Sequence, residues 1–527
     1  MVNKNLKYTY EQKICNVILG MLVFTLIFNN IPKPIQLNFL GGPVGSKLVV
    51  YPLIAAFAYT FYCQYKYKNV FVDIKPFLKY ILVFISIMLL STIVGLFNYP
   101  YYDLVLNGPV NQIEKLPKVL AFCHAHGVDV DSKLLMQAWI IARQLKSVLM
   151  EAFWCFGGAY IIYCWYKDDW QQAVDILIKS LIASFTVLFL YAVVEVAYLG
   201  GNLTSRSILT AINPYIHTIV TNHGWWPPLL WKDQLRLVFP EPSHVGNFIA
   251  LGLPVIWYKY FNKNEKIWGI SLLITIIMSF LVFMTKARTA YAMLFGMTIL
   301  LLALIVLGKQ LKLIKQYIVI CVCIAIGFGC FVGFSSIKSN NAAKPKDNIA
   351  VEALENNFAS LASSNKRSNG ARYALLKSHF RTGLQHPVLG VGRGLTSAYV
   401  EHNFTPEEAK NIEVVQWIKY QRERGPMAYG YSIPDAMNEF VTRFSTSGIL
   451  GFIVFFFPFA YVLLRLLKQW RNDKQLASMF MAFALISSLV AGCNGSVNLL
   501  YAIWILLGIA YAMALGKQKE KESNESA

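Results

Sequence analysis

The sequence predicts an all-α fold, a polytopic integral membrane helical bundle of about 12 transmembrane helices. Two features of composition lead to this prediction: 56% of the 527 residues are hydrophobic, and only 14% are charged. A third is the spacing of the apolar runs, because a bilayer core of ~30 Å needs roughly 20 apolar residues per helix and many runs reach that length. Such a composition excludes an ordinary soluble globular protein.

The predicted spans are apolar runs separated by Lys-bearing or Gly/Pro-bearing breaks. They lie near 14–30, 47–63, 77–97, 147–166, 176–199, 244–260, 267–285, 288–307, 314–335, 447–467, 475–492 and 498–516. The first run lacks a small-residue cleavage site and is followed by Ile31-Pro32-Lys33-Pro34, so we expect a retained span rather than a removed signal peptide.

Positive charge orients the predicted bundle. Basic residues cluster in alternate short loops, which the positive-inside rule assigns to the cytoplasm. These residues are Lys66, Lys68, Lys75, Lys79, Lys259, Lys263, Lys266, Lys309, Lys312, Lys315, Arg465, Lys468, Arg471 and Lys474. Both termini are then cytoplasmic, and three longer segments face outward: 98–146, 200–243 and 336–446.

These assignments divide the chain into five parts. An amino-terminal transmembrane bundle with its outer loop 98–146 covers residues 1–199. An outer loop with the central transmembrane helices covers 200–335, and a large outer loop containing short helices covers 336–446. The carboxy-terminal transmembrane helices and a polar cytoplasmic tail cover 447–516 and 517–527.

Arginine is distributed differently from lysine. Of the 13 arginines, only Arg465 and Arg471 lie in the predicted cytoplasmic loops. Because arginine binds phosphate through a rigid planar fork, an outer face rich in arginine suits a phosphate-bearing ligand. Ordinary surface pairing is the alternative, since Arg422 and Arg424 flank Glu423. Arg288 is the strongest candidate for a phosphate-binding arginine, because it lies between two apolar runs that have almost no loop between them. The alternative is that its side chain only anchors the helix by snorkelling to the membrane interface.

The segment 200–243 carries a candidate general base. Two prolines bracket Glu241 at the entrance to a predicted span, and His244 follows three residues later. A carboxylate fixed in this way can accept a proton from a hydroxyl, whereas the alternative is that Glu241 and Ser243 cap the next helix. The tryptophans of 225–231 fit an interfacial belt better than a sugar-stacking platform.

The segment 336–446 has a mild excess of positive charge, which suits an anionic ligand. Its residues 350–362 and 405–424 have the periodicity of short surface helices, and we expect the second to lie on the bilayer surface over the site. Between them, glycines at 390, 392 and 394 would allow close backbone approach to a ligand. Arg372 and Arg381 precede them.

Together these motifs resemble the O-antigen ligase and O-antigen polymerase superfamily of bacterial inner membranes. The resemblance covers roughly 236–465. The motifs that carry it are Glu-Pro-Ser (241–243), Ala-Arg-Thr-Ala (287–290), the Arg372 to Gly383 spacing, His-Pro-x-x-Gly-x-Gly-x-Gly (386–394) and Asn-Glu-Phe…Gly-Ile-Leu-Gly (438–451). Amino-terminal to this region, the chain resembles the superfamily only in having a series of predicted membrane spans.

The resemblance implies glycosyl transfer on the periplasmic face from an undecaprenyl-diphosphate-linked glycan, inverting and without cofactor, nucleotide sugar or metal. The expected catalytic residues are Glu241, His244 and His386. The expected substrate-binding residues are Arg236, Arg288, Arg372, Arg381, Arg393, Gly390, Gly392 and Asn438. The expected partners are the lipid-linked donor and acceptor, the bilayer, and chain-length-regulator and flippase proteins, with no nucleic acid.

Within the superfamily, the motif around Asn438 favours a polymerase. Ligases carry His-Asn where this chain has Met437-Asn438, and that histidine is a proposed base. The alternatives are a ligase that transfers the glycan to lipid A-core, and a transporter or flippase. A transporter would need charged groups through to the cytoplasmic side, whereas the candidate residues here cluster on the outer face. We expect Glu151 and Glu195, in or near spans, to be paired within the bundle, and Cys123-His124-Ala-His126 not to bind metal.

Overall fold

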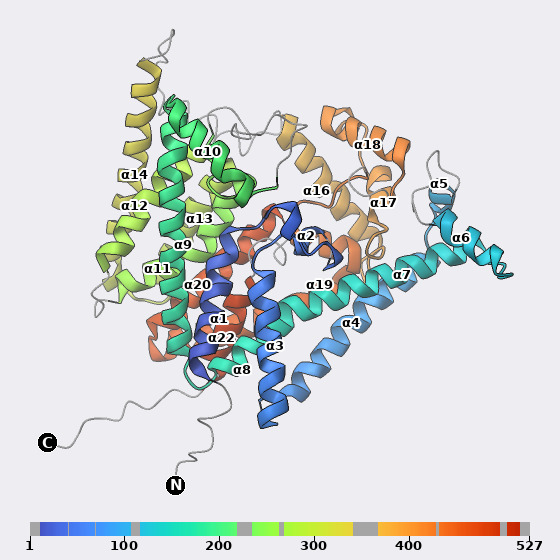
Figure 1. Ribbon diagram of the computed structural model, residues 1–527, viewed down its shortest axis with the longest axis horizontal. Coiled ribbons are helices and arrows are strands. Elements are labelled where there is room, and N and C mark those ends of the chain that lie inside the picture. Colours follow the sequence, from blue (N-terminus) through green and yellow to red (C-terminus); the bar gives the residue numbers. More distant parts are fainter. Residues whose placement is uncertain are drawn as a thin grey trace.

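The computed structural model is all-helical (Figure 1). It describes residues 11–40, 42–68, 70–106, 116–218, 234–262, 268–340, 367–427, 432–495 and 503–516. Seven helices in this part of the chain are long and apolar enough to cross a membrane, and three shorter helices are also apolar. The protein is therefore a multi-pass membrane helical bundle, as the composition predicts.

Each of the 12 predicted spans coincides with a helix. The helices are α1 (Gln12–Phe24), α3 (Val50–Tyr67), α4 (Ile74–Phe97), α8 (Gly158–Tyr166), α9 (Trp170–Leu199), α11 (Ser243–Phe261), α12 (Trp268–Thr285), α13 (Arg288–Leu307), α14 (Ile314–Asn340), α19 (Glu439–Asp473), α20 (Leu476–Ala491) and α22 (Ile503–Leu515). That all 12 cross the bilayer remains a prediction.

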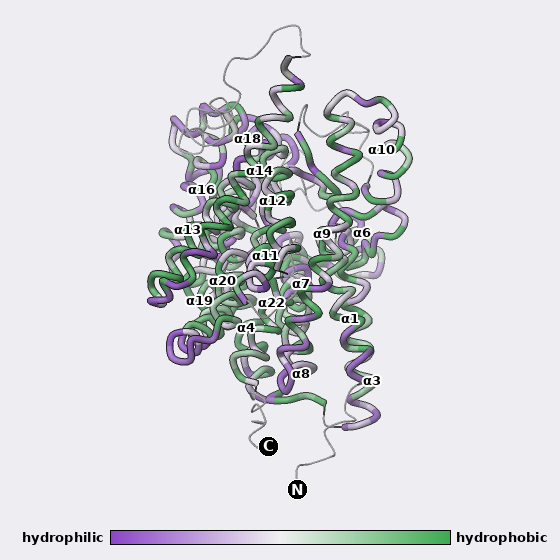
Figure 2. The backbone as a smooth tube through the Cα atoms, turned by 90° about the vertical axis from the view of Figure 1, so that its left-hand side faces the viewer, coloured by the Kyte–Doolittle hydropathy of each residue, from purple (hydrophilic) through white to green (hydrophobic). Residues whose placement is uncertain are grey.

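The remaining α-helices lie in the longer connecting segments. They are α2 (Gly42–Gly45), α5 (Tyr102–Leu106), α6 (Leu116–Ala125), α7 (Ser132–Glu151), α10 (Leu203–Ile216), α16 (Arg367–Gln385), α17 (Thr396–His402) and α18 (Ile412–Arg424). In Figure 1, α10, α16, α17 and α18 lie at the upper end of the bundle, and Figure 2 shows that α16 and α18 carry many of its hydrophilic residues.

Three helices form the centre of the bundle. Almost every residue of α11 is buried, as are most of α20 and all the apolar residues of α22 except Tyr511 and Leu515. A helix that is apolar on all sides is stable only when other helices surround it. By contrast, only about a third of α4 and α14 is buried, so both present apolar surface outward.

Contacts between helix ends divide the bundle into two faces. The Tyr166 hydroxyl donates to Asn16 Oδ1 at 2.9 Å, and the backbone of Gly516 lies against that of Lys167. The start of α1 and the ends of α8 and α22 therefore share one face. On the opposite face, the Thr218 amide donates to the Asn30 carbonyl at 2.9 Å. This grouping matches the predicted alternation of loops, while the cytoplasmic and periplasmic assignment of the faces remains a prediction.

The structure corrects the sequence prediction in the connecting segments. The span predicted at 147–166 is the second half of a continuous helical segment that begins at Ser132 and contains a π-helical turn over Ala152–Gly157. The helix predicted over 405–424 begins only at Ile412, where Asn411 caps it. Val414 of α18 is fully buried with Ala371 and Ala374 of α16, beside Trp417 and Ile418. One side of α18 therefore packs on α16, whereas Val415 is exposed. That α18 lies on the bilayer surface over the site remains a prediction.

The predicted helix 350–362, the tryptophans of 225–231 and the tail 517–527 lie outside the described residues.

Candidate active site

Three helices begin close together at the end of the bundle that we predict to face outward. Near the starts of α11 and α13, the backbones almost touch, because a Cβ atom on Gly246 would lie 2.6 Å from the Cα of Ala290. The guanidinium of Arg288, the first residue of α13, donates to Asn369 Oδ1 in the first turn of α16 at 2.6 Å. We call this junction of α11, α13 and α16 the helix-start cluster.

The helix-start cluster is strongly positive. The amino-terminal ends of helices carry partial positive charge and unpaired N–H groups, and the N-cap residues of α11 and α13, Pro242 and Ala287, make no side-chain capping hydrogen bond. Arg372 lies near enough to interact electrostatically with Arg288. Within the described ranges, neither arginine forms an ion pair with a carboxylate. Such an arrangement can bind an anion.

Glu241 lies at the entrance to α11, and its side chain is exposed to solvent. Its carboxylate is 3.4 Å from the Ser243 hydroxyl, and its carbonyl accepts the His244 amide at 3.1 Å. The alternative that the side chains of Glu241 and Ser243 cap α11 is not observed. The structure thus places Glu241 just before α11, His244 and Arg288 on the first turns of α11 and α13, and Arg372 on the second turn of α16.

Arg236 lies one segment earlier and is buried. The backbone N–H groups of Arg236 and Leu237 donate to the two carboxylate oxygens of Glu195 on α9, at 3.1 Å and 2.7 Å. The prediction that Glu195 is satisfied within the bundle is confirmed, although its hydrogen-bond partners are backbone amides rather than a side-chain cation.

The glycines of the loop after α16 face another stretch of backbone. Gly390 and Gly392 have φ of 66° and 91°. The N–H of Gly392 donates to the Thr446 carbonyl at 2.9 Å, and the N–H of Ile449 donates to the Pro387 carbonyl at 2.8 Å. A Cβ on Gly390 would lie 2.5 Å from the backbone of Ser447. These glycines therefore allow the loop to pack against the kink of α19 at Gly448, and their contact with a ligand remains a prediction.

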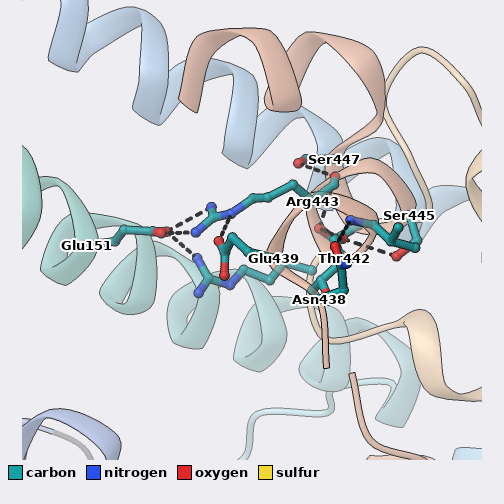
Figure 3. A network of polar contacts seen from close by, with 10 residues as sticks. Glu151, Asn438, Glu439, Thr442, Arg443, Ser445 and Ser447 are labelled. Carbon is teal, nitrogen blue, oxygen red and sulfur yellow. Dashed lines mark hydrogen bonds and ion pairs between the residues drawn. The ribbon is translucent and has the colours of Figure 1, made fainter. Parts of the chain in front are cut away.

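A buried ion-pair network joins Glu151, the last residue of α7, to Glu439 and Arg443 at the start of α19 (Figure 3). Both terminal nitrogens of Arg443 donate to the carboxylate of Glu151, and Arg443 Nε donates to Glu439 at 2.6 Å. Arg393 adds a contact to Glu151 at 2.7 Å. The side chains of Arg443 and Glu151 are only 8% and 6% exposed, so each charge depends on its partners. The prediction that Glu151 is paired within the bundle is confirmed.

The other predicted residues occupy separate positions. Arg381 forms a fork with Glu408, at 2.5 Å and 2.9 Å, and also donates to the Asn403 carbonyl. Burial alone would raise the pKa of Glu408, but the hydrogen bonds from Arg381 and Thr405 hold it below its usual value. Asn438 caps α19 through the Val441 amide at 3.1 Å. His386 packs edge-on against Tyr399, and burial lowers its pKa.

Sequence reasoning assigned no role to Glu439, Arg443 or His379. Glu439 and Arg443 stand four residues apart at the start of α19, a spacing that places them on one helix face. That spacing was the available signal, although the partner Glu151 lies 292 residues away from Arg443. The His379 ring is buried between Ser445 Oγ, at 3.0 Å, and the Pro434 carbonyl, at 3.1 Å. Burial lowers its pKa, so His379 joins α16 to α19 as a neutral ring.

The fold and the helix-start cluster define a multi-pass membrane protein with a cationic site at one end of the bundle. Residues 273–456 match the family model described as O-Antigen ligase, which confirms the resemblance predicted from the motifs. Over this stretch the chain is similar to that family, whose enzymes transfer lipid-linked glycans. The stretch contains Arg288, Arg372, the glycine loop and Arg443, whereas Glu151, Glu195 and Glu241 lie outside it. No curated protein matches the chain.

Proposed function

We propose that this protein is a periplasmic-face glycosyltransferase that polymerises undecaprenyl-diphosphate-linked repeat units into a surface polysaccharide, an O-antigen, capsule or exopolysaccharide. The observation that carries the proposal is the helix-start cluster, where Arg288 and Arg372 lie beside the entrance to α11 with no carboxylate pairing them in the described chain. The match to the O-antigen ligase family over residues 273–456 supports the same reaction class.

In the proposed reaction, Arg288 and Arg372 clamp the diphosphate of the donor. As the bond between the anomeric carbon and the phosphate oxygen breaks, the diphosphate takes the electron pair and gathers negative charge. Preplaced cations stabilise that charge without reorganising, and the arginine fork matches two phosphate oxygens at once. The amino-terminal ends of α11 and α13 add partial positive charge at the same place.

Glu241 acts as the general base. Its exposed carboxylate accepts the proton of the acceptor hydroxyl while that oxygen forms the new bond to the anomeric carbon from the opposite face. The products are a glycan longer by the donor chain, with inverted configuration at the new linkage, and undecaprenyl diphosphate. His244, three residues further along at the start of α11, orients the carboxylate.

The choice of polymerase over ligase rests on Met437. This residue precedes Asn438 where ligases of the superfamily carry a histidine, and its thioether cannot accept a proton as a base. In a polymerase both donor and acceptor are lipid-linked, so both reach the site from the bilayer. The retained Asn438 caps α19 and so has a structural role that does not depend on a neighbouring histidine.

The test is a reaction of the detergent-purified protein with undecaprenyl-diphosphate repeat units, in EDTA and without nucleotide, followed by gel analysis of chain length. A ladder is the expected result. Transfer only when lipid A-core is added would instead identify a ligase. Inertness in both reactions, with substrate that an active membrane preparation elongates, would contradict both transferases and favour a transporter.

A further inference from the structure

We infer that Glu195 is a positioning residue for the helix-start cluster. It lies on α9, outside the stretch that matches the family, and its side chain is completely buried. The inference rests on the proposed function, because the residue that Glu195 positions is the proposed base, Glu241.

The first observation is a strained turn. Leu237 has φ of 59°, a left-handed conformation that a branched, non-glycine side chain rarely adopts. Such a conformation persists only where the surrounding structure holds it in place, and it is typical of functional sites. Leu237 stands four residues before Glu241 and six before the first residue of α11.

The second observation is the way in which the carboxylate holds this turn. One oxygen of Glu195 accepts the Arg236 amide at 3.1 Å, and the other accepts the Leu237 amide at 2.7 Å. Two successive N–H groups directed at one carboxylate form the kind of backbone nest that binds anions. Here the bound anion is a side chain of the protein itself, and hydrogen bonds to a charged acceptor are stronger than those between neutral groups.

The third observation ties the same turn to Arg288. The Leu235 amide donates to the Met284 carbonyl at 3.0 Å, near the end of α12 and four residues before Arg288. The side chains of Leu235, Leu237 and Phe239 are fully buried, so the segment has no freedom to shift on its apolar side. The turn therefore connects the approach to Glu241 with the approach to Arg288, and Glu195 fixes it from α9.

The consequence is a division of roles between two carboxylates. Glu241 is exposed and faces the reaction, whereas Glu195 contacts no substrate and acts through the backbone. Removing the negative charge of Glu195 would weaken both hydrogen bonds and release the strain of Leu237. A shift of about 1 Å at a catalytic group can cost on the order of 10²-fold in rate.

The experiment compares the purified wild-type protein with Glu195→Gln and with Asp175→Asn. Asp175 lies on the same helix, α9, at its other end, where it pairs with Lys259 at 3.4 Å. Asp175→Asn therefore makes the same acid-to-amide change far from the turn. Chain elongation gives kcat and KM for the lipid-linked acceptor, and amide hydrogen exchange over 234–239 follows the turn independently of activity.

For Glu195→Gln we expect kcat to fall about 10²-fold, with KM changed less than about threefold. Exchange at Arg236 and Leu237 should rise about 10-fold or more, because each amide loses a hydrogen bond to a charged acceptor. Asp175→Asn should match wild type in both measurements. A merely structural role would instead lower the amount of folded protein and leave kcat per folded molecule intact.

Full elongation by Glu195→Gln would overturn the inference. Fast exchange of the Arg236 and Leu237 amides in the wild-type protein would also overturn it, and that measurement does not depend on a variant that folds. If the wild-type protein forms no ladder, the proposed function fails. The exchange measurement still decides whether Glu195 holds the Arg236 and Leu237 amides. If Glu195→Gln does not fold, Glu195→Asp keeps the charge but shortens the reach, and the same loss of kcat is expected.

Discussion

Two pairs of arginines have opposite surroundings. Arg393 and Arg443 share the buried carboxylate of Glu151, and Arg443 also binds Glu439. Arg288 and Arg372 are at least partly exposed, lie near each other, and pair with no carboxylate in the described part of the chain. Carboxylates of the protein neutralise the first pair, whereas our proposal assigns the second pair to an external anion. The arginines that the sequence groups together therefore differ in their partners within the structure.

The largest expected effect falls on the helix-start cluster. Glu241→Gln should reduce polymer formation by on the order of 10²–10⁴-fold, because an amide cannot accept the proton of the acceptor hydroxyl. Glu241 is exposed and makes no ion pair within the described residues, so the variant should insert in the membrane and melt like wild type. Chain-length gels and thermal unfolding in detergent measure the two quantities. Retention of normal chain length would remove the base role.

The buried network should respond in the opposite way. Arg443→Leu removes the ion pairs of Arg443 with Glu439 and with Glu151, and breaking a buried ion pair on one side costs about 3–5 kcal/mol. It also removes the guanidinium that lies 3.9 Å from the centre of the Phe455 ring. We expect a marked fall in the unfolding temperature of the purified protein. Unchanged stability together with a strong loss of rate would mean that this pair, too, contacts substrate.

A change that preserves charge sharpens the comparison. Arg288→Lys keeps the positive charge but loses the fork that matches two phosphate oxygens, so elongation should fall on the order of 10²–10³-fold without loss of stability. The hydrogen bond to Asn369 also changes, and Asn369→Ala controls for it. If Arg288→Lys elongates normally while Asn369→Ala does not, Arg288 serves to anchor α16 rather than to bind diphosphate.

The smallest effect is expected at the surface. Arg422 pairs with Glu401 at 3.0 Å, but its side chain is 74% exposed, and exposed pairs contribute at most about 1 kcal/mol. Arg422→Ala should leave both the elongation rate and the unfolding temperature near wild type. A loss of elongation rate as large as that expected for Arg288→Lys would show that exposure and ion pairing do not distinguish substrate-binding arginines from structural ones.

The helices could be predicted from sequence because the signal is local. An apolar run of about 20 residues is enough by itself to predict a membrane-spanning helix. In the same way, the motif at 287–290 predicts that Arg288 lies at the start of a helix. The pairing of arginines is a long-range property: Glu151 meets Arg443 across 292 residues of chain. The glycines at 390 and 392 give a similar case: the sequence indicates a close backbone approach, but it does not reveal that the backbone of α19 is one partner of that approach.

The central claim is that Arg288 and Arg372, which pair with no carboxylate among the described residues, bind the lipid diphosphate. The most direct measurement is the affinity of the purified protein for undecaprenyl diphosphate, comparing wild type with the Arg288→Lys, Arg372→Lys double variant and with Arg422→Ala. We expect the double variant to bind at least about tenfold more weakly, because both forks are lost, and Arg422→Ala to bind like wild type. Equal affinity in all three proteins would contradict the account.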